Sequence, residues 1–239
     1  MPAKAIAAAI ISFPKAYPIL IILLIFTSKV TTIDLGGENM IKTTRMLRNE
    51  LKDYANPAAR IRQLVKLGKL VPVVRGMYET DRGVPGHYLA QVIYGPSYLS
   101  FEFALAYYSL IPEAVYNYPS ATFEKKKAKR YDTLYGTFTY RDIPSEAYPV
   151  GVMLHMEEGY SFQVASPEKA VCDQLYNMPP MRNRKELEYL LFEDLRIDEG
   201  GFSELNMAKL MEIAACFRTK NHKLLLSYVR RGLRKGAYD

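Results

Sequence analysis

The stretch Asn56–Glu79, NPAARIRQLVKLGKLVPVVRGMYE, decides the fold of the N-terminal region of this chain. Asn56 is a favourable N-cap residue and Pro57 suits the first position of a helix, so a helix is predicted to begin here. Its apolar pattern continues to about Leu67, and Gly68 is a suitable residue for ending a helix.

A β-hairpin is predicted directly after this helix. Leu70–Val74 is rich in valine, and Met77–Glu79 can return across a turn at Arg75 and Gly76. Pro72 has no backbone N–H to donate, so the first strand of the hairpin is expected at the edge of a sheet.

An earlier helix is predicted from Thr43 or Thr44 to about Tyr54, because Leu47, Leu51 and Tyr54 recur at helical spacing. Two helices followed by a small hairpin is the order of a winged helix-turn-helix. Residues 40–82 are therefore predicted to form a winged helix-turn-helix DNA-binding domain.

The positive charge of the chain is concentrated in this region. The whole chain of 239 residues has a formal net charge of +7. Met40–Arg82 contains ten Lys/Arg against four acidic residues, whereas 19 Lys/Arg balance 19 Asp/Glu from Gly83 to the end. A basic segment joined to a neutral remainder is typical of a nucleic-acid-binding protein.

The rest of the chain, residues 83–239, is predicted to be a C-terminal α/β domain. GVPG at Gly83–Gly86 has the composition of a linker. Three or four antiparallel strands are predicted, followed by a helix that Ser166 caps and by three more helices. The strand segments are Ala114–Phe123, Tyr131–Asp142, Val150–Met156 and Tyr160–Val164, and the later helices lie near Arg184–Leu195, Glu204–Phe217 and Asn221–Arg234. The expected fold class is α+β, with a winged helix-turn-helix, a small antiparallel sheet and C-terminal helices.

Residues 1–39 are an apolar extension with several interpretations. Ala5–Phe26 is strongly apolar, but Pro14, Lys15 and Pro18 interrupt it, whereas a membrane-spanning helix needs about 20 consecutive apolar residues. One hypothesis is that translation starts at Met40, which the intact mass of the native protein would test. We expect a cytoplasmic protein, with a membrane anchor through residues 5–26 as the alternative.

No catalytic or metal site can be assembled from the sequence. The acidic residues near the strands lack the spacing of a metal site, and no Gly-rich phosphate loop occurs. Cys172 lies among apolar residues and is interpreted as a buried structural cysteine. The three histidines, His87, His155 and His222, lie far apart in the sequence. The chain is therefore not expected to be an enzyme, nor to use a cofactor, a metal or a small-molecule substrate.

Two further basic runs lie outside the predicted DNA-binding domain. Lys125–Arg130 is either a second phosphate contact or a solvated loop. The run Arg218–Lys235 contains seven Lys/Arg and no acid, and its charge is expected to be attracted by the acidic helices of Glu186–Glu212.

Four blocks of sequence together resemble the AbiEi family of antitoxins. The blocks are LVKLGKLVPVVRGMYE, YGPSYLSFEFALAYYSLIPE, YGTFTYRDIP and ASPEKAVCDQLY, and the resemblance extends over about Thr43–Arg231. It implies an N-terminal winged helix and a C-terminal antitoxin domain in a type IV abortive-infection toxin–antitoxin system. It also implies repression of the protein's own operon through inverted repeats in the promoter, and functional opposition to a nucleotidyltransferase-like toxin. By this resemblance the recognition helix contains Arg60, Arg62, Gln63 and Lys66, and the wing contains Arg75 and Gly76.

The basic residues around the two helices are the predicted DNA contacts. Arg62, Gln63 and Lys66 are predicted to face bases in a major groove. Arg60, Lys69 and Arg75 are predicted near phosphates, and Lys42, Arg45 and Lys52 near the flanking phosphates. Inverted repeats require two copies of the protein, preassembled or meeting on DNA.

The alternative function is a protein-interaction antitoxin with a vestigial winged helix and no specific DNA binding. One departure from the usual fold supports it: if Met40 is the first residue, no helix precedes the two-helix core.

Overall fold

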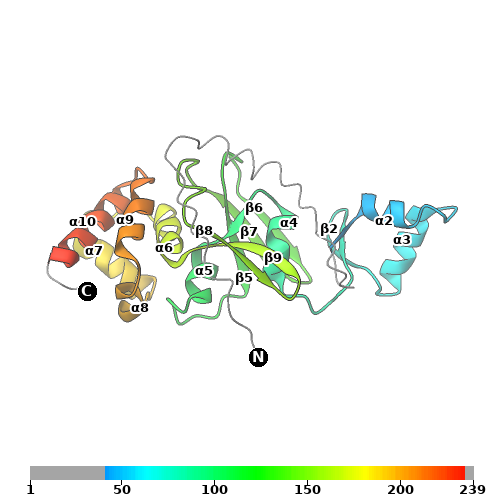
Figure 1. Ribbon diagram of the computed structural model, residues 1–239, viewed down its shortest axis with the longest axis horizontal. Coiled ribbons are helices and arrows are strands. Elements are labelled where there is room, and N and C mark those ends of the chain that lie inside the picture. The colour runs from blue at the N-terminus through cyan, green and yellow to red at the C-terminus, as the bar shows by residue number, and fades with distance from the viewer. Residues whose placement is uncertain (1–40, 235–239) are drawn as a thin grey trace, which may run out of the picture. The chain divides into compact units, whose positions relative to one another are not determined.

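The computed structural model describes residues 41–234, and the interpretations of residues 1–39 lie outside this part (Figure 1). The contacts divide the chain into Met1–Asp34 and Leu35–Asp239, so every described residue belongs to the second unit. Among the described helices, none is both long and apolar enough to cross a membrane. The described fold is a mixed α+β structure with two sheets.

The first described elements match the predicted order of two helices and a hairpin. They are β1 (Lys42–Thr43), α2 (Thr44–Glu50), α3 (Pro57–Lys66), β2 (Val71–Val74) and β3 (Met77–Glu79). The strands form an antiparallel sheet in the order β1-β3-β2, so β2, which contains Pro72, lies at an edge as predicted. Helix α2 ends earlier than expected, because the chain turns at Leu51 instead of continuing to Tyr54.

Side chains of this segment pack in two directions. Leu47, Ile61 and Leu70 form a small core of their own between the helices and the hairpin. Val71 and Val73, on β2, instead belong to the large core of the molecule. The small sheet is thus packed against the remainder mainly through alternate residues of β2, with Met77 of β3 also in contact with the large core.

The second sheet has six strands in the order β6-β7-β5-β4-β9-β8. Its strands are β4 (Tyr98–Leu99), β5 (Asn117–Thr122), β6 (Lys129–Thr133), β7 (Gly136–Asp142), β8 (Val152–Glu157) and β9 (Tyr160–Ala165). The prediction of an antiparallel sheet was wrong, because β5 pairs parallel with β7 and β4 pairs parallel with β9. The predicted strand Tyr131–Asp142 is a hairpin of β6 and β7, and the two-residue strand β4 is too short to have a recognisable pattern.

Helices cover the sheet and continue to the C-terminal end of the described chain. Those near the sheet are the 3₁₀ helix η1 (Gly86–Leu89), α4 (Ala90–Ile93), α5 (Phe101–Tyr107) and α6 (Pro167–Tyr176). The remaining elements are α7 (Arg184–Tyr189), the π-helix η2 (Leu190–Asp194), α8 (Glu199–Ser203), α9 (Met207–Ala215) and α10 (Lys220–Arg234). Ser166 caps α6 as predicted, since its hydroxyl accepts a hydrogen bond from the Lys169 backbone N–H at 3.3 Å.

The segment Gly83–Gly86, expected to be a linker, is partly packed: Val84 and Gly86 are buried, whereas Gly83 and Pro85 are exposed. Val84 is buried in the large core, and Gly86 is buried where η1 begins. Tyr135 donates a hydrogen bond from its hydroxyl to the carbonyl of Asp81 at 2.8 Å, which attaches the preceding residues to the β6–β7 turn. A domain boundary at residues 82 and 83 stays a prediction.

Replacing Gly86 with alanine is expected to lower the free energy of unfolding by about 1–3 kcal/mol, the usual cost of overpacking. A Cβ atom at this position would overlap the Tyr118 ring and lie 2.5 Å from the Tyr135 carbonyl oxygen, which belongs to the backbone and cannot rotate away. Urea unfolding measures the change. Gly83→Ala is the control, because its Cβ would come no nearer than 3.4 Å to a neighbour; equal stabilities of the two variants would contradict the packing described here.

Candidate nucleic-acid interface

Helix α3 presents one apolar face and one polar face. The Asn56 side chain accepts a hydrogen bond from the Ala59 N–H at 2.9 Å and so caps the helix, as predicted. Ile61 is buried against the small core. Arg62, Gln63 and Lys66 are all exposed, and α3 contains no acidic residue. The three side chains predicted to face bases therefore share an accessible surface free of negative charge from its own helix.

Arg60 and Gln63, predicted to have different roles, are bonded to each other. The Arg60 guanidinium donates to the Gln63 side-chain oxygen at 2.7 Å, and it lies over the Tyr54 ring at 5.1 Å. Tyr54 is 49% exposed, so this arrangement lies at the surface. Because Arg60 uses one of the two lone pairs of the Gln63 oxygen, the amide NH₂ is the group of Gln63 with the most capacity left for a partner.

The basic residues of β1, of α2 and of the turn after α2 differ in whether an acidic side chain pairs with them. Lys42 forms an ion pair with Glu50 at 2.8 Å, and both side chains are partly exposed. Arg45, Arg48 and Lys52 are exposed and form no ion pair with any described residue. Arg48 was not among the predicted contacts, although its position off the apolar face of the helix was already visible in the sequence.

The turn of the hairpin is attached to the start of α2. The Gly76 carbonyl accepts hydrogen bonds from the Thr44 N–H at 2.8 Å and from the Thr44 hydroxyl at 3.2 Å. Gly76 has a φ of +85°, a conformation that glycine adopts without strain. Arg75 and Lys69 are both exposed, and Arg75 lies in this turn beside the first residue of α2. The nine predicted residues lie on β1, α2 and α3 and in the turns that follow α2, α3 and β2, and Lys42 and Arg60 are the least available because each already has a side-chain partner.

Two acids of this region, Glu79 and Asp81, have carboxylates that accept hydrogen bonds from backbone N–H groups. Glu79 is completely buried, and its carboxylate accepts hydrogen bonds from the backbone N–H groups of Thr80 at 2.7 Å and Asp81 at 3.3 Å. Burial raises the pKa of Glu79 above its usual value, in spite of these hydrogen bonds. The Asp81 carboxylate accepts a bond from the Gly83 N–H at 2.7 Å.

A polar cluster around Glu157 was not predicted, because its members are far apart in the sequence. The Glu157 carboxylate accepts hydrogen bonds from the hydroxyls of Tyr107 at 3.0 Å and Tyr88 at 3.2 Å, and His87 Nε2 lies at 3.8 Å. The hydrogen bond from Tyr107 holds the pKa of Glu157 below its usual value. His155 lies beside Tyr107, with 3.4 Å between its Nδ1 and the tyrosine hydroxyl. In residues 41–234 no group of three or more His, Cys, Asp or Glu side chains could hold a metal ion.

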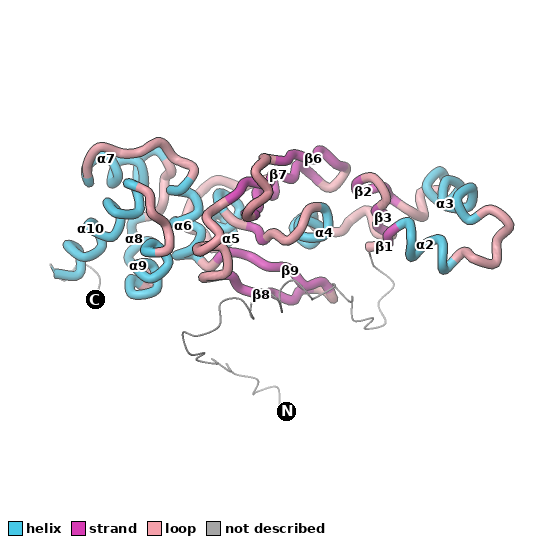
Figure 2. Tube along the Cα trace, turned by 90° about the horizontal axis from the view of Figure 1, so that it is seen from above, coloured by secondary structure: helices cyan, strands magenta, loops and turns pink. Residues whose placement is uncertain are grey.

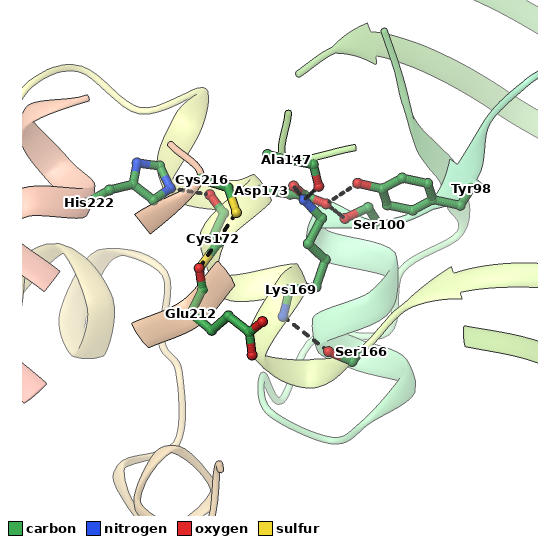
Figure 3. Close-up of polar contacts among 10 residues, drawn as sticks. All are labelled: Tyr98, Ser100, Ala147, Ser166, Lys169, Cys172, Asp173, Glu212, Cys216 and His222. Carbon is green, nitrogen blue, oxygen red and sulfur yellow. Dashed lines mark hydrogen bonds and ion pairs between the residues drawn. The ribbon is translucent and has the colours of Figure 1, made fainter. Parts of the chain in front are cut away.

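A second polar network is completely buried and connects α6 to the sheet (Figure 3). Lys169 Nζ forms an ion pair with Asp173 at 3.0 Å and donates to the Ala147 carbonyl at 2.7 Å. Asp173 also accepts hydrogen bonds from the hydroxyls of Tyr98 at 2.9 Å and Ser100 at 2.7 Å. Because these side chains have no exposed surface, the network is interpreted as structural.

Cys172 is buried, as predicted, and burial raises the pKa of its thiol well above the usual value. His222 contacts the backbone carbonyl of Cys172 through Nε2 at 2.9 Å, rather than the thiol. The pair therefore lacks the hydrogen bond by which a histidine activates a cysteine nucleophile.

The basic residues of α10 form no ion pair with another described residue. The helix packs against α7 and α9, and the electrostatic attraction between α10 and the acidic helices stays a prediction. The exposed basic residues of this helix are Lys220, Lys223, Arg230, Arg231 and Arg234. This helix was given no role in the predicted interface.

No protein-family model and no curated protein matches the chain. Among solved structures, the crystal structure of the RV2827C protein from Mycobacterium tuberculosis is similar over 79% of this chain and 76% of that chain, with 14% identical residues and a TM-score of 0.42. A similarity this weak establishes neither the fold nor the function of this chain.

Proposed function

We propose that this protein is a DNA-binding autorepressor and antitoxin of a toxin–antitoxin operon, and that β1–β3 with α2 and α3 form a winged helix-turn-helix. The order β1-α2-α3-β2-β3, with β1 beside β3, supports the winged-helix assignment. The observation that carries the proposal is the exposed face of α3, on which Arg62, Gln63 and Lys66 lie together without an acid.

In the proposed complex, α3 enters the major groove of the promoter DNA. Arg62 and Lys66 donate to base edges, and Gln63 donates from its amide while Arg60 holds its oxygen. A guanidinium is well suited to the two acceptors of guanine, and the amide NH₂ of glutamine to N7 of adenine. Because Arg60 fixes the Gln63 side chain, little conformational entropy is lost when that side chain meets a base.

The remaining cations are proposed to contact the DNA backbone. Lys69 and Arg75 follow α3 and lie in and near the hairpin, whereas Arg45 and Lys52 lie on α2 and just after it. Such contacts position the protein on the duplex but are insensitive to sequence. Lys42 contributes least in this scheme, because Glu50 already offsets its charge.

The double substitution Arg62→Ala with Lys66→Ala is expected to weaken binding to the promoter at least about tenfold, since each base contact contributes roughly 1–3 kcal/mol. A gel-shift titration at fixed salt concentration measures the change in affinity. The matched control is Arg182→Ala with Lys185→Ala, which removes the same charge from two exposed residues elsewhere. Equal affinities of the two double variants would refute the assignment of α3.

Replacing Lys69 or Arg75 with alanine is expected to weaken binding to all DNA sequences alike. The slope of log K against log salt concentration should fall by roughly one for each phosphate that the variant no longer neutralises. Gln63→Ala should instead reduce the preference among bases with little change in this slope. Fluorescence anisotropy with the promoter and with a scrambled duplex, over a series of salt concentrations, separates the two behaviours.

The antitoxin role is proposed from the resemblance of the four sequence blocks. The proposed partner is a nucleotidyltransferase-like toxin encoded nearby, opposed either through contact or without it. Co-expression with that toxin tests this role, and rescue of growth is expected from the wild-type chain. The alternative, a protein-interaction antitoxin with a vestigial winged helix, is supported if growth is rescued but promoter DNA is not shifted at low salt.

A further inference from the structure

The two edge strands of the six-stranded sheet, β6 and β8, differ in chemical character. Strand β6 carries Lys129, Arg130 and Asp132, all exposed. Strand β8 has the sequence VMLHME, with no formal charge before its last residue and no proline. Natural proteins use charged residues and proline on edge strands to prevent pairing with another chain. In this sheet only β6 has such protection.

Strand β8 also exposes large apolar side chains. Leu154 is 65% exposed, Met156 is 68% exposed and Met153 is 40% exposed. Strand β8 lies beside β9 in the sheet (Figure 2). Among the described residues it is hydrogen-bonded to β9 alone, so no described strand pairs with the backbone groups on its other side. An uncharged, apolar strand with a free edge is suited to pairing with another strand.

The two faces of β8 are in different surroundings. His155 and Glu157 belong to the polar cluster and contact Tyr107 of α5. Because successive side chains alternate, Val152, Leu154 and Met156 lie on the opposite face. The contacts of His155 and Glu157 with Tyr107 hold β8 in position. Leu154 and Met156, on the opposite face, stay exposed.

The sequence of β8 is self-complementary about Leu154. Two identical antiparallel strands related by a twofold axis perpendicular to the sheet must be centred on one residue. Centring on Leu154 places it opposite its own copy, Val152 opposite Met156, and Met153 opposite His155. Centring one residue later would place Val152 opposite Glu158 instead. The first register pairs apolar residues throughout the exposed face.

We propose that β8 is a self-association surface, through which a second copy of this chain pairs antiparallel, edge to edge, with Leu154 at the twofold axis. The proposal does not depend on DNA binding. A contact made mainly by one strand is small, below the roughly 1,200 Å² typical of stable complexes, so the dimer forms reversibly at micromolar concentrations.

Sedimentation equilibrium of the full chain without DNA tests the proposal. The weight-average mass is expected to rise towards twice that of one chain as the concentration increases through the micromolar range. Leu154→Lys should abolish this rise, because two ammonium groups would meet at the axis. Leu134→Lys is the control: Leu134 is 77% exposed at the β6–β7 turn and should leave dimerisation unchanged. Thermal melting of both variants checks that they remain folded.

Cysteine cross-linking tests the register in a Cys216→Ala background. Leu154→Cys should form a disulfide-linked dimer on mild oxidation, because its partner is its own copy. Met156→Cys should not, because it faces Val152. The proposal would be overturned if the chain is a monomer at every concentration, or if Leu154→Lys still dimerises. Equal cross-linking of Leu154→Cys and Met156→Cys would also overturn it.

Discussion

Replacing Asp173 with asparagine is expected to lower the free energy of unfolding by about 3–5 kcal/mol, the usual cost of breaking a buried ion pair. Asp173 and Lys169 are both completely buried on α6, with 3.0 Å between their charged groups. An asparagine still accepts a hydrogen bond from Tyr98 or Ser100 but leaves the Lys169 ammonium without a counter-charge. Chemical denaturation of the purified variant measures the decrease in stability.

Another ion pair of similar length provides the control for this experiment. Arg130 and Asp132 are separated by 2.9 Å, but their side chains are 65% and 64% exposed. Asp132→Asn should leave stability almost unchanged, because water screens an exposed pair. The double variant Lys169→Met with Asp173→Asn should recover part of the stability, since no unpaired charge is then buried. If Asp132→Asn and Asp173→Asn lower the free energy of unfolding equally, Asp173 is not buried as described.

The stability of the protein is expected to fall by about 3 kcal/mol between pH 6.5 and pH 4, at about 1.4 kcal/mol per pH unit, because His222 is buried as the neutral imidazole. Burial lowers the pKa of His222 from 6.5 to about 4. Between these pH values the unfolded chain binds a proton that the folded chain excludes. The stabilisation is therefore complete above pH 6.5 and is lost progressively as the pH falls towards the folded-state pKa.

The surroundings of His222 explain this depressed pKa. Its ring is completely buried and stacks on Phe217 with 4.2 Å between the ring centroids. Burial outweighs the hydrogen bond that Nε2 donates to the Cys172 carbonyl, which by itself raises the pKa. The Lys169 ammonium repels the added proton and so also disfavours protonation. Burial also lowers the pKa of His87, which contributes to the slope in the same direction.

Urea unfolding at several pH values between 4.5 and 7.5 tests this prediction. His222→Phe keeps an aromatic ring against Phe217 but has no titrating group. Most of the slope of unfolding free energy against pH should therefore disappear, whatever the overall stability of this variant. Val229→Ala, at a buried position of α10, is the control, because it destabilises the core and retains the imidazole. The prediction fails if His222→Phe and Val229→Ala show the same dependence on pH.

Local sequence patterns predicted the elements of the candidate interface well. The cap at Asn56, the glycine at the hairpin turn and the edge position of the strand with Pro72 all depend on residues a few positions apart. The exposure of Arg62, Gln63 and Lys66 follows from helical periodicity. The bond between Arg60 and Gln63 was missed, although their i, i+3 spacing allowed it.

The sequence by itself determined the caps, the turns and the concentration of positive charge near α3, because each of these follows from short-range chemistry. Only the tertiary structure decided the mixed pairing of the large sheet, since β4 and β9 meet across more than sixty intervening residues. It also decided that Tyr98 donates to Asp173, 75 residues later, and that β8 is left as an apolar edge. These features arise from contacts between residues distant in the chain, which the spacing of neighbouring residues does not encode.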